Sequence, residues 1–257
     1  MRFPTTALVL STLAAGQALA ASISHQGKMH NHAERHVDLM KAHHERRELD
    51  HRDTSLISAA DTSNILKLGV NAIGLNAVSK GDAPWVGSDG QFTNTFHNTA
   101  GEDLVLVIWG PSGSWINAIR PQITVSIPEN SSKTISFPTG WSGAWAPIYG
   151  SSKLVNGQIS DTWGEATFQP PYSVVDVSRE VNMNGKSMSI VGPQCVTDMN
   201  TCVFTCKGGA STCLDQYQLV NCETGSQAGA NKGTWGGADS GGCGGMGSGA
   251  QLNTYLG

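Results

Sequence analysis

Cysteine is absent from the first 194 residues, and basic residues are scarce after Thr54, where nine Lys or Arg face 14 Asp or Glu (9 − 14 = −5). Without a basic cluster, the chain lacks the electrostatic mark of a protein that binds nucleic acid or an anionic membrane. No apolar run is long enough to cross a bilayer, so we expect no membrane span. The cysteines show no CxxC spacing and no nearby histidine, which argues against zinc, and we expect no cofactor.

The N-terminus has the parts of a secretory signal peptide. Arg2 is followed by an apolar stretch over residues 7–15 and by the A-x-A signal Ala18-Leu19-Ala20. We therefore expect residues 1–20 to be removed after Ala20. The product is expected to be secreted, either as an extracellular protein or held in the cell wall.

Residues 21–53 are charged and rich in histidine. They hold seven of the eight histidines and few apolar residues, so this segment cannot bury a core of its own. One interpretation is a disordered leader or pro-segment that is cut after Arg47. The other is metal capture by His32, His36 and His43, the first two of which are helical neighbours. We favour the pro-segment, because histidine density alone is a compositional signal.

The remainder of the chain is predicted to be one all-β domain. Residues 54–81 have apolar positions at mixed helical spacing, which indicates a linker or a short amphipathic segment. Residues 82–257 contain short β-type runs between turn residues, and the apolar run DLVLVIWG (103–110) is typical of a strand buried on both faces. This pattern predicts a disulfide-stapled antiparallel β-sandwich. We expect the glycine-rich tail, residues 225–250, to be irregular and to be attached to the body by Cys243.

All the cysteines lie in the last quarter of the chain, and an even number in a secreted protein predicts three disulfides among 15 possible pairings. They are Cys195, Cys202, Cys206, Cys213, Cys222 and Cys243. Cys202 and Cys206 are too close on one extended strand to bond with each other, so each is expected to pair elsewhere. The sequon at Asn130 predicts a glycosylated surface loop.

Two isolated carboxylates, Glu165 and Asp176, stand inside runs that otherwise have strand character. Strand alternation puts Trp163 on the face of Glu165, and Tyr172 on the face of Asp176. Aromatic rings and carboxyls together are the chemistry of carbohydrate sites. We expect these four residues to line one groove and to bind a ligand there.

Long strings of this sequence resemble the secreted fungal allergen family typified by Asp f 4. They include NTAGEDLVLVIWGPSGSWIN, SGAWAPIYGSSKLVNGQISDTWGE and YSVVDVSREVNMNGKSMSIVGPQCVTDMNTCVFTCKGG. The resemblance implies a secreted fungal protein that can bind IgE. It implies no particular molecular activity.

Shorter elements are similar to thaumatin-like proteins, which are disulfide-rich β-sandwiches with an acidic cleft. These elements are KTISFPTGWSGAWAP, WGEATF and VVDVS. The resemblance implies that Glu165 and Asp176 are acids of the cleft. Pro147 stands where that family has an arginine and Val181 where it has a further acid, with Glu180 one place early, so the resemblance implies an incomplete cleft.

Three functions remain open. The first is a binding module that holds β-glucan or another wall glycan without cleaving it. The second is a β-glucan hydrolase with Glu165 as the acid and Asp176 as the base or nucleophile. The third is a host-interaction protein without a small ligand, which an exposed apolar patch and no cleft would favour. The incomplete cleft ranks binding first.

Overall fold

The computed structural model describes residues 56–257, except residues 112 and 214. The predicted signal peptide with Ala20 and the leader with Arg47, His32, His36 and His43 lie outside the described residues. Within the described part of the chain, no helix has the length and apolar character needed to cross a membrane.

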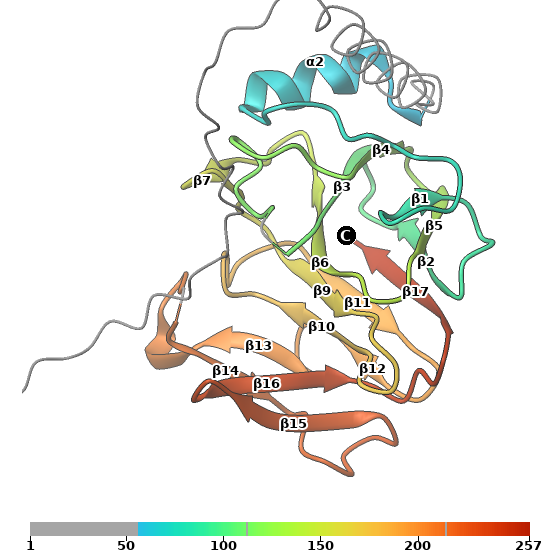
Figure 1. Cartoon of the computed structure of the whole chain (residues 1–257). Helices are drawn as coiled ribbons and strands as arrows, with labels where there is room; N and C mark the ends of the chain where they lie inside the picture. Colours follow the sequence, from blue (N-terminus) through green and yellow to red (C-terminus); the bar gives the residue numbers. More distant parts are fainter. Residues whose placement is uncertain (1–55, 112, 214) are drawn as a thin grey trace, which may run out of the picture. The chain divides into compact units, whose positions relative to one another are not determined.

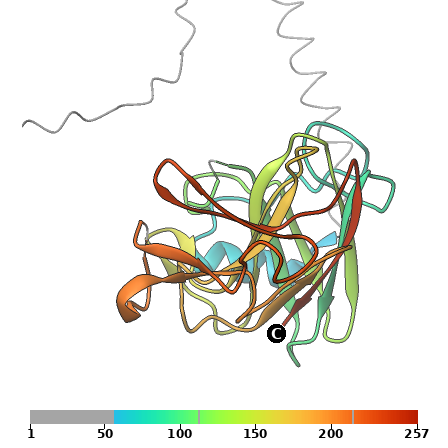
Figure 2. The ribbon, with the colours of Figure 1, turned by 90° about the horizontal axis from the view of Figure 1, so that it is seen from below.

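Two sheets form the body, and the smaller one has six strands (Figure 1). In spatial order they are β1 (Trp85–Val86), β5 (Ser132–Phe137), β2 (Phe92–Asn98), β17 (Ala250–Leu256), β11 (Met188–Val191) and β12 (Val196–Thr197). The pair β2 and β17 is parallel, and the other pairs of this sheet are antiparallel. Seen from below, the red C-terminal end of the chain lies next to green strands of the N-terminal half (Figure 2).

The larger sheet has nine strands, of which seven form a continuous row. That row is β14 (Tyr217–Val220), β13 (Val203–Cys206), β10 (Val174–Ser178), β9 (Trp163–Thr167), β6 (Ser142–Ile148), β3 (Leu104–Trp109) and β4 (Ile123–Ile127). β15 (Ala230–Trp235) and β16 (Ala238–Cys243) form a hairpin that joins the row where Cys243 faces Val175 of β10. Only β10 and β13 pair in parallel among the described strands of this sheet. A separate two-stranded ribbon consists of β7 (Leu154–Val155) and β8 (Gln158–Ile159).

The inner faces of the two sheets enclose one apolar core. Phe96 of the smaller sheet packs edge-on against Trp145 of the larger sheet, with ring centroids 5.5 Å apart. Phe92 stacks on Phe168 at 4.8 Å. Side chains from both sheets thus fill the space between them, as in sheet-on-sheet packing. The predicted all-β sandwich is confirmed, with the difference that two strand pairs are parallel.

A second apolar cluster lies on the outer face of the larger sheet. Strand β3 is buried along its whole length, as its apolar run predicts, because Leu106 and Ile108 face the inner core while Val107 and Trp109 face the outer cluster. The outer cluster covers only part of this face. The uncovered part is where the candidate site lies.

Helix α2 (Ala59–Leu68) supplies part of that cover. The hydroxyl of Ser58 accepts a hydrogen bond from the backbone N–H of Asp61 and caps the helix, and Gly69 ends it in the left-handed conformation. Ile65 is buried against the outer cluster. Of the two interpretations for residues 54–81, the described part therefore has the amphipathic helix, and it packs on the body.

The middle of the glycine-rich tail, residues 230–243, is regular, which corrects the expectation of an irregular segment. It forms the β15–β16 hairpin and leads into β17. Gly236 and Gly237 adopt the positive φ values that the tight hairpin turn needs. Gly242 passes so close to β10 that a Cβ there would lie 2.7 Å from the carbonyl oxygen of Val175. The glycines serve a turn and a close backbone approach.

All six cysteines are paired, which confirms the predicted disulfides. The bonds are Cys195–Cys243, Cys202–Cys222 and Cys206–Cys213. Cys202 and Cys206 have different partners, as expected. Cys195 lies just before β12 and Cys243 ends β16, so this bond joins the smaller sheet to the hairpin of the larger one and attaches the tail.

One glycine of β9 gives a testable packing prediction. A Cβ at Gly164 would overlap the indole of Trp145, which is fully buried. We expect Gly164→Ala to lower the free energy of unfolding by about 1–3 kcal/mol, the usual cost of overpacking a core. Denaturant unfolding measures this change. Gly81→Ala is the matched control, because a Cβ there meets nothing within 4 Å; equal losses in the two variants would contradict the prediction.

Candidate functional site

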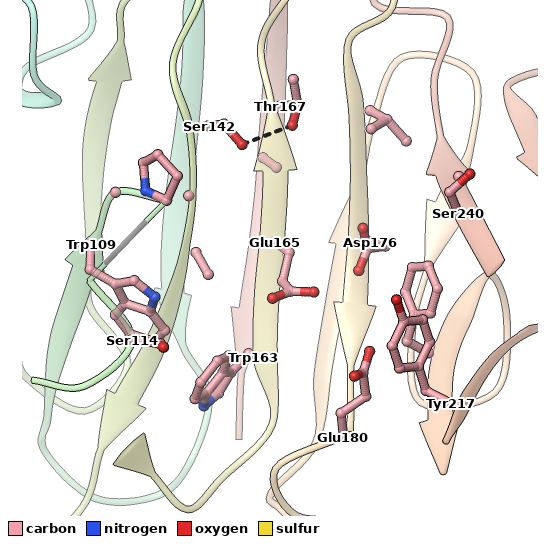
Figure 3. A pocket seen from close by; sticks show the side chains of 18 of the residues that line it. Trp109, Ser114, Ser142, Trp163, Glu165, Thr167, Asp176, Glu180, Tyr217 and Ser240 are labelled. Carbon is pink, nitrogen blue, oxygen red and sulfur yellow. Dashed lines mark hydrogen bonds between the residues drawn. The ribbon is translucent and has the colours of Figure 1, made fainter. Parts of the chain in front are cut away.

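A groove of about 540 Å³ opens on the uncovered outer face of the larger sheet (Figure 3). Strands β6, β9 and β10 form its floor, the loop after β3 lines one side, and β14 and β16 line the other. Its lining consists of Trp109, Gly110, Pro111, Ser114, Ser142, Gly143, Ala144, Trp163, Glu165, Ala166, Thr167, Val174, Asp176, Glu180, Phe204, Tyr217, Asp239, Ser240 and Gly241. This volume lies within the range of ligand pockets, about 300–1,000 Å³.

Glu165 and Asp176 lie directly opposite each other on β9 and β10. Opposed residues on antiparallel strands point to the same face with Cβ atoms about 4.5–5.5 Å apart. Figure 3 shows both carboxyls on the floor of the groove. Asp176 is only 6% exposed, and its Oδ1 has no hydrogen-bond partner among the described residues. The structure thus brings together the two acids that the sequence singled out.

Two further acids complete the lining, Glu180 just beyond β10 and Asp239 on β16. Asp239 accepts a hydrogen bond from the backbone N–H of Leu219 at 2.9 Å, which ties β16 to β14. Asp176, Ser178 and Glu180 stand at alternate positions, so strand periodicity alone places Glu180 on the same face as Asp176. Asp239 had no such signal, because only the distant β15–β16 hairpin brings it to the groove.

Burial raises the pKa of the three neighbouring acids. It raises the pKa of Glu165 to about 7. Burial, and then the charges of Glu165 and Glu180, raise the pKa of Asp176 well above its usual range. The pKa of Glu180 rises to about 8 through burial and the charge of Glu165, against a smaller opposing effect of the Ser178 hydroxyl. The groove therefore favours protonated carboxyls up to neutral pH.

The aromatic residues of the groove differ from those expected. Trp163 lines the groove, but its ring packs edge-on against Trp109 at 4.9 Å and its Nε1 donates to the carbonyl of Ile159. It forms part of a wall with little exposed ring. Tyr217 of β14 lies beside Glu180 in Figure 3, and burial followed by the charge of Glu180 raises its pKa.

Tyr172 does not line the groove, which corrects its expected place. Its side chain is 81% exposed, and its backbone N–H bonds to the carbonyl of Gln169 in a turn. Strand β10 begins only at Val174, so the alternation that linked Tyr172 to Asp176 does not extend that far. The tyrosine that lines the groove is Tyr217 of β14.

The two departures from the thaumatin-like pattern, Pro147 and Val181, do not remove the acidic lining of the groove. Pro147 pairs with Leu106 in the sheet and is absent from the lining. Val181 packs against the outer apolar cluster. Glu180 supplies a carboxyl in spite of its shifted position. The groove thus has two carboxyls, those of Glu180 and Asp239, in addition to those of Glu165 and Asp176.

Two other predicted sites can be placed. The sulfurs of Cys195, Cys202 and Cys243 lie within 4.8 Å of one another, but each belongs to a disulfide and none is free to bind a metal. Asn130 lies in an exposed turn between β4 and β5. Its side chain is therefore accessible to glycosylation.

A family model, the Allergen Asp f 4-like domain, matches residues 86–234. The chain belongs to the Asp f 4-like allergen family. The match confirms the first resemblance and includes the strands that carry Glu165, Asp176 and Tyr217, and it ends before β16. No curated protein matches the chain. Among solved structures, the thaumatin-like xylanase inhibitor TLXI is similar, with 9% identity, a TM-score of 0.36, and coverage of 63% of this chain and 97% of that one.

Proposed function

We propose that this Asp f 4-like protein is secreted and binds a wall glycan, β-glucan or another wall polysaccharide, in the acidic groove without cleaving it. The observation that carries the proposal is the carboxyl of Asp176, which lines the groove while its buried oxygen has no partner among the described residues. A buried polar group without a partner costs about 1–3 kcal/mol. Sugar hydroxyls would supply hydrogen bonds there, and Tyr217 offers an aromatic surface nearby.

The titration of the acids supports binding over cleavage. A glycosidase needs one protonated and one ionised carboxyl, and its environment separates their pKa values. Here burial raises the pKa of Glu165, Asp176 and Glu180 alike. Below neutral pH the groove thus favours three neutral acids, which can exchange hydrogen bonds with hydroxyls and lack a base or nucleophile.

One observation favours the hydrolase as a second candidate. Glu165 and Asp176 face each other on neighbouring strands, and a retaining glycosidase likewise needs two adjacent carboxyls, about 5–5.5 Å apart. The pKa of Asp176 is raised well above its usual range and that of Glu165 to about 7. In this candidate one of the two carboxyls would protonate the leaving oxygen and the other, ionised, would be the nucleophile. Release of reducing sugar near neutral pH, abolished by Glu165→Gln, would establish this candidate.

Binding of IgE is proposed on family membership alone. It is a property of the folded surface and needs no groove. The host-interaction alternative was expected to show no cleft, and the groove favours the glycan proposal over it.

The proposal is tested by a glycan array of wall polysaccharides, followed by calorimetric titration of the best ligand. We expect Tyr217→Ala to weaken binding about 5-fold, since an aromatic contact contributes about 1 kcal/mol beyond its buried area. Tyr255→Ala is the matched control, because Tyr255 is exposed on the smaller sheet, outside the groove. An array without any bound glycan, or equal losses in both variants, would contradict the proposal.

A further inference from the structure

The charge of the groove has one sign only. Its lining includes the carboxyls of Glu165, Asp176, Glu180 and Asp239, and contains no Lys, Arg or His. The ion pairs of the described residues lie elsewhere, between Lys186 and Glu102 and between Lys232 and Glu223. No basic residue of the lining compensates the acids of the floor.

Asp176 lacks a counter-charge on every side that is described. Glu165 faces it from β9, Glu180 follows it beyond the end of β10, and Tyr217 of β14 and Asp239 of β16 line the same groove. Asp239 has the backbone N–H of Leu219 as a partner, whereas Oδ1 of Asp176 has none. A buried carboxylate is costly unless an opposite charge accompanies it. A cationic ligand would bring the charge that the protein does not provide.

We propose that the groove selects a polysaccharide with free amino groups, a glucosamine-type polymer, over its N-acetylated form and over neutral glucan, with an ammonium group seated between Glu165 and Asp176. The inference rests on the proposed glycan-binding function and names the ligand class. No covalent bond forms or breaks. When an ammonium group binds, the carboxyl that meets it releases its proton to the solvent.

Proton release gives this ligand class a pH signature. Because the pKa of Glu165 is raised to about 7, the groove must lose a proton to form the ion pair at acidic pH. The affinity for an amino sugar therefore rises from about pH 5 to about pH 7, by up to tenfold per unit for each proton released. An N-acetylated sugar forms no ion pair, and its affinity shows no such rise.

The experiment compares three hexamers by calorimetric titration of the full chain: glucosamine, N-acetylglucosamine and β-1,3-linked glucose. At about pH 7 and low salt we expect the glucosamine hexamer to bind at least ~10-fold more tightly than the N-acetylated hexamer, as for a desolvated charge pair. Asp176→Asn and Glu165→Gln, which keep the side-chain shape, should each remove this preference. Glu129→Gln, on an exposed turn, should retain it.

The outcomes separate the amino-sugar inference from the proposed glycan binding. If the N-acetylated or glucose hexamer binds as tightly as the glucosamine hexamer, the amino-sugar inference is overturned and glycan binding stands. If none of the hexamers binds and the longer wall polysaccharides do not bind either, both the amino-sugar inference and the proposed glycan binding are overturned. If Glu129→Gln removes the preference as fully as Asp176→Asn, the attraction is a property of the whole acidic surface, and the inference also fails. Thermal unfolding shows that each variant is folded.

Discussion

Replacement of Cys195 and Cys243 by alanine is expected to lower the free energy of unfolding by about 4 kcal/mol. The two cysteines are 48 residues apart. Loss of a cross-link over a loop of this length increases the entropy of the unfolded chain, which stabilises the unfolded state by about 4 kcal/mol at 25 °C. The bond also joins the smaller sheet to the β15–β16 hairpin. At about 2–4 °C per kcal/mol for a body of this size, Tm should fall by roughly 8–16 °C.

The double variant Cys206→Ala/Cys213→Ala is the internal comparison. Its cysteines are only seven residues apart, so the same model gives a loss of about 2 kcal/mol. Denaturant unfolding under non-reducing conditions measures both variants. If the short loop proves as important as the long one, chain entropy does not govern the contribution of these bonds.

Unfolding at different pH values should show a body that is more stable in mild acid than above neutrality. Burial raises the pKa of Glu165 to about 7 and that of Glu180 to about 8, and raises that of Asp176 in the same direction. Between the unfolded pKa and these values the folded state holds protons that the unfolded state has released. Stability is therefore fully present below about pH 4.5 and is lost as the pH rises through about 7 and 8.

We expect a decrease of at least ~2 kcal/mol between about pH 5 and pH 8.5, since each unit of pKa shift corresponds to about 1.4 kcal/mol and coupling reduces the sum. The triple variant Glu165→Gln/Asp176→Asn/Glu180→Gln should flatten this dependence, and Glu129→Gln should retain it. A wild-type Tm that is level or rises over this range would show that the groove acids are solvated.

Much of the fold was accessible from local sequence pattern. Strand alternation placed Glu165 and Asp176 on one face, and the continuous apolar run predicted the double burial of β3. These signals are strong because each depends only on neighbours along one strand. The predicted position of Tyr172 was wrong because Tyr172 lies in a turn before Val174, where the strand and its alternation have not yet begun.

Residues from distant strands account for what the sequence did not reveal. Tyr217 and Asp239 reach the groove because β14 pairs with β13 and the β15–β16 hairpin attaches to β10. Neither pairing has a local signal. The tail was misjudged because glycine content is typical both of flexible linkers and of strands that bend closely over a neighbour, as Gly242 does over β10.

The central position of β17 has a consequence for how the protein is made. Residues 250–256 insert between β2 and β11, so the smaller sheet is divided until these residues have been synthesised. One edge of β2, formed early, must wait for a partner more than 150 residues later, which is a slow, non-local pairing with an edge that other chains can bind. The sheet can therefore close only after the ribosome has released residues 250–256. A chain that stops before residue 250 would leave two unpaired edges where the sheet should be continuous.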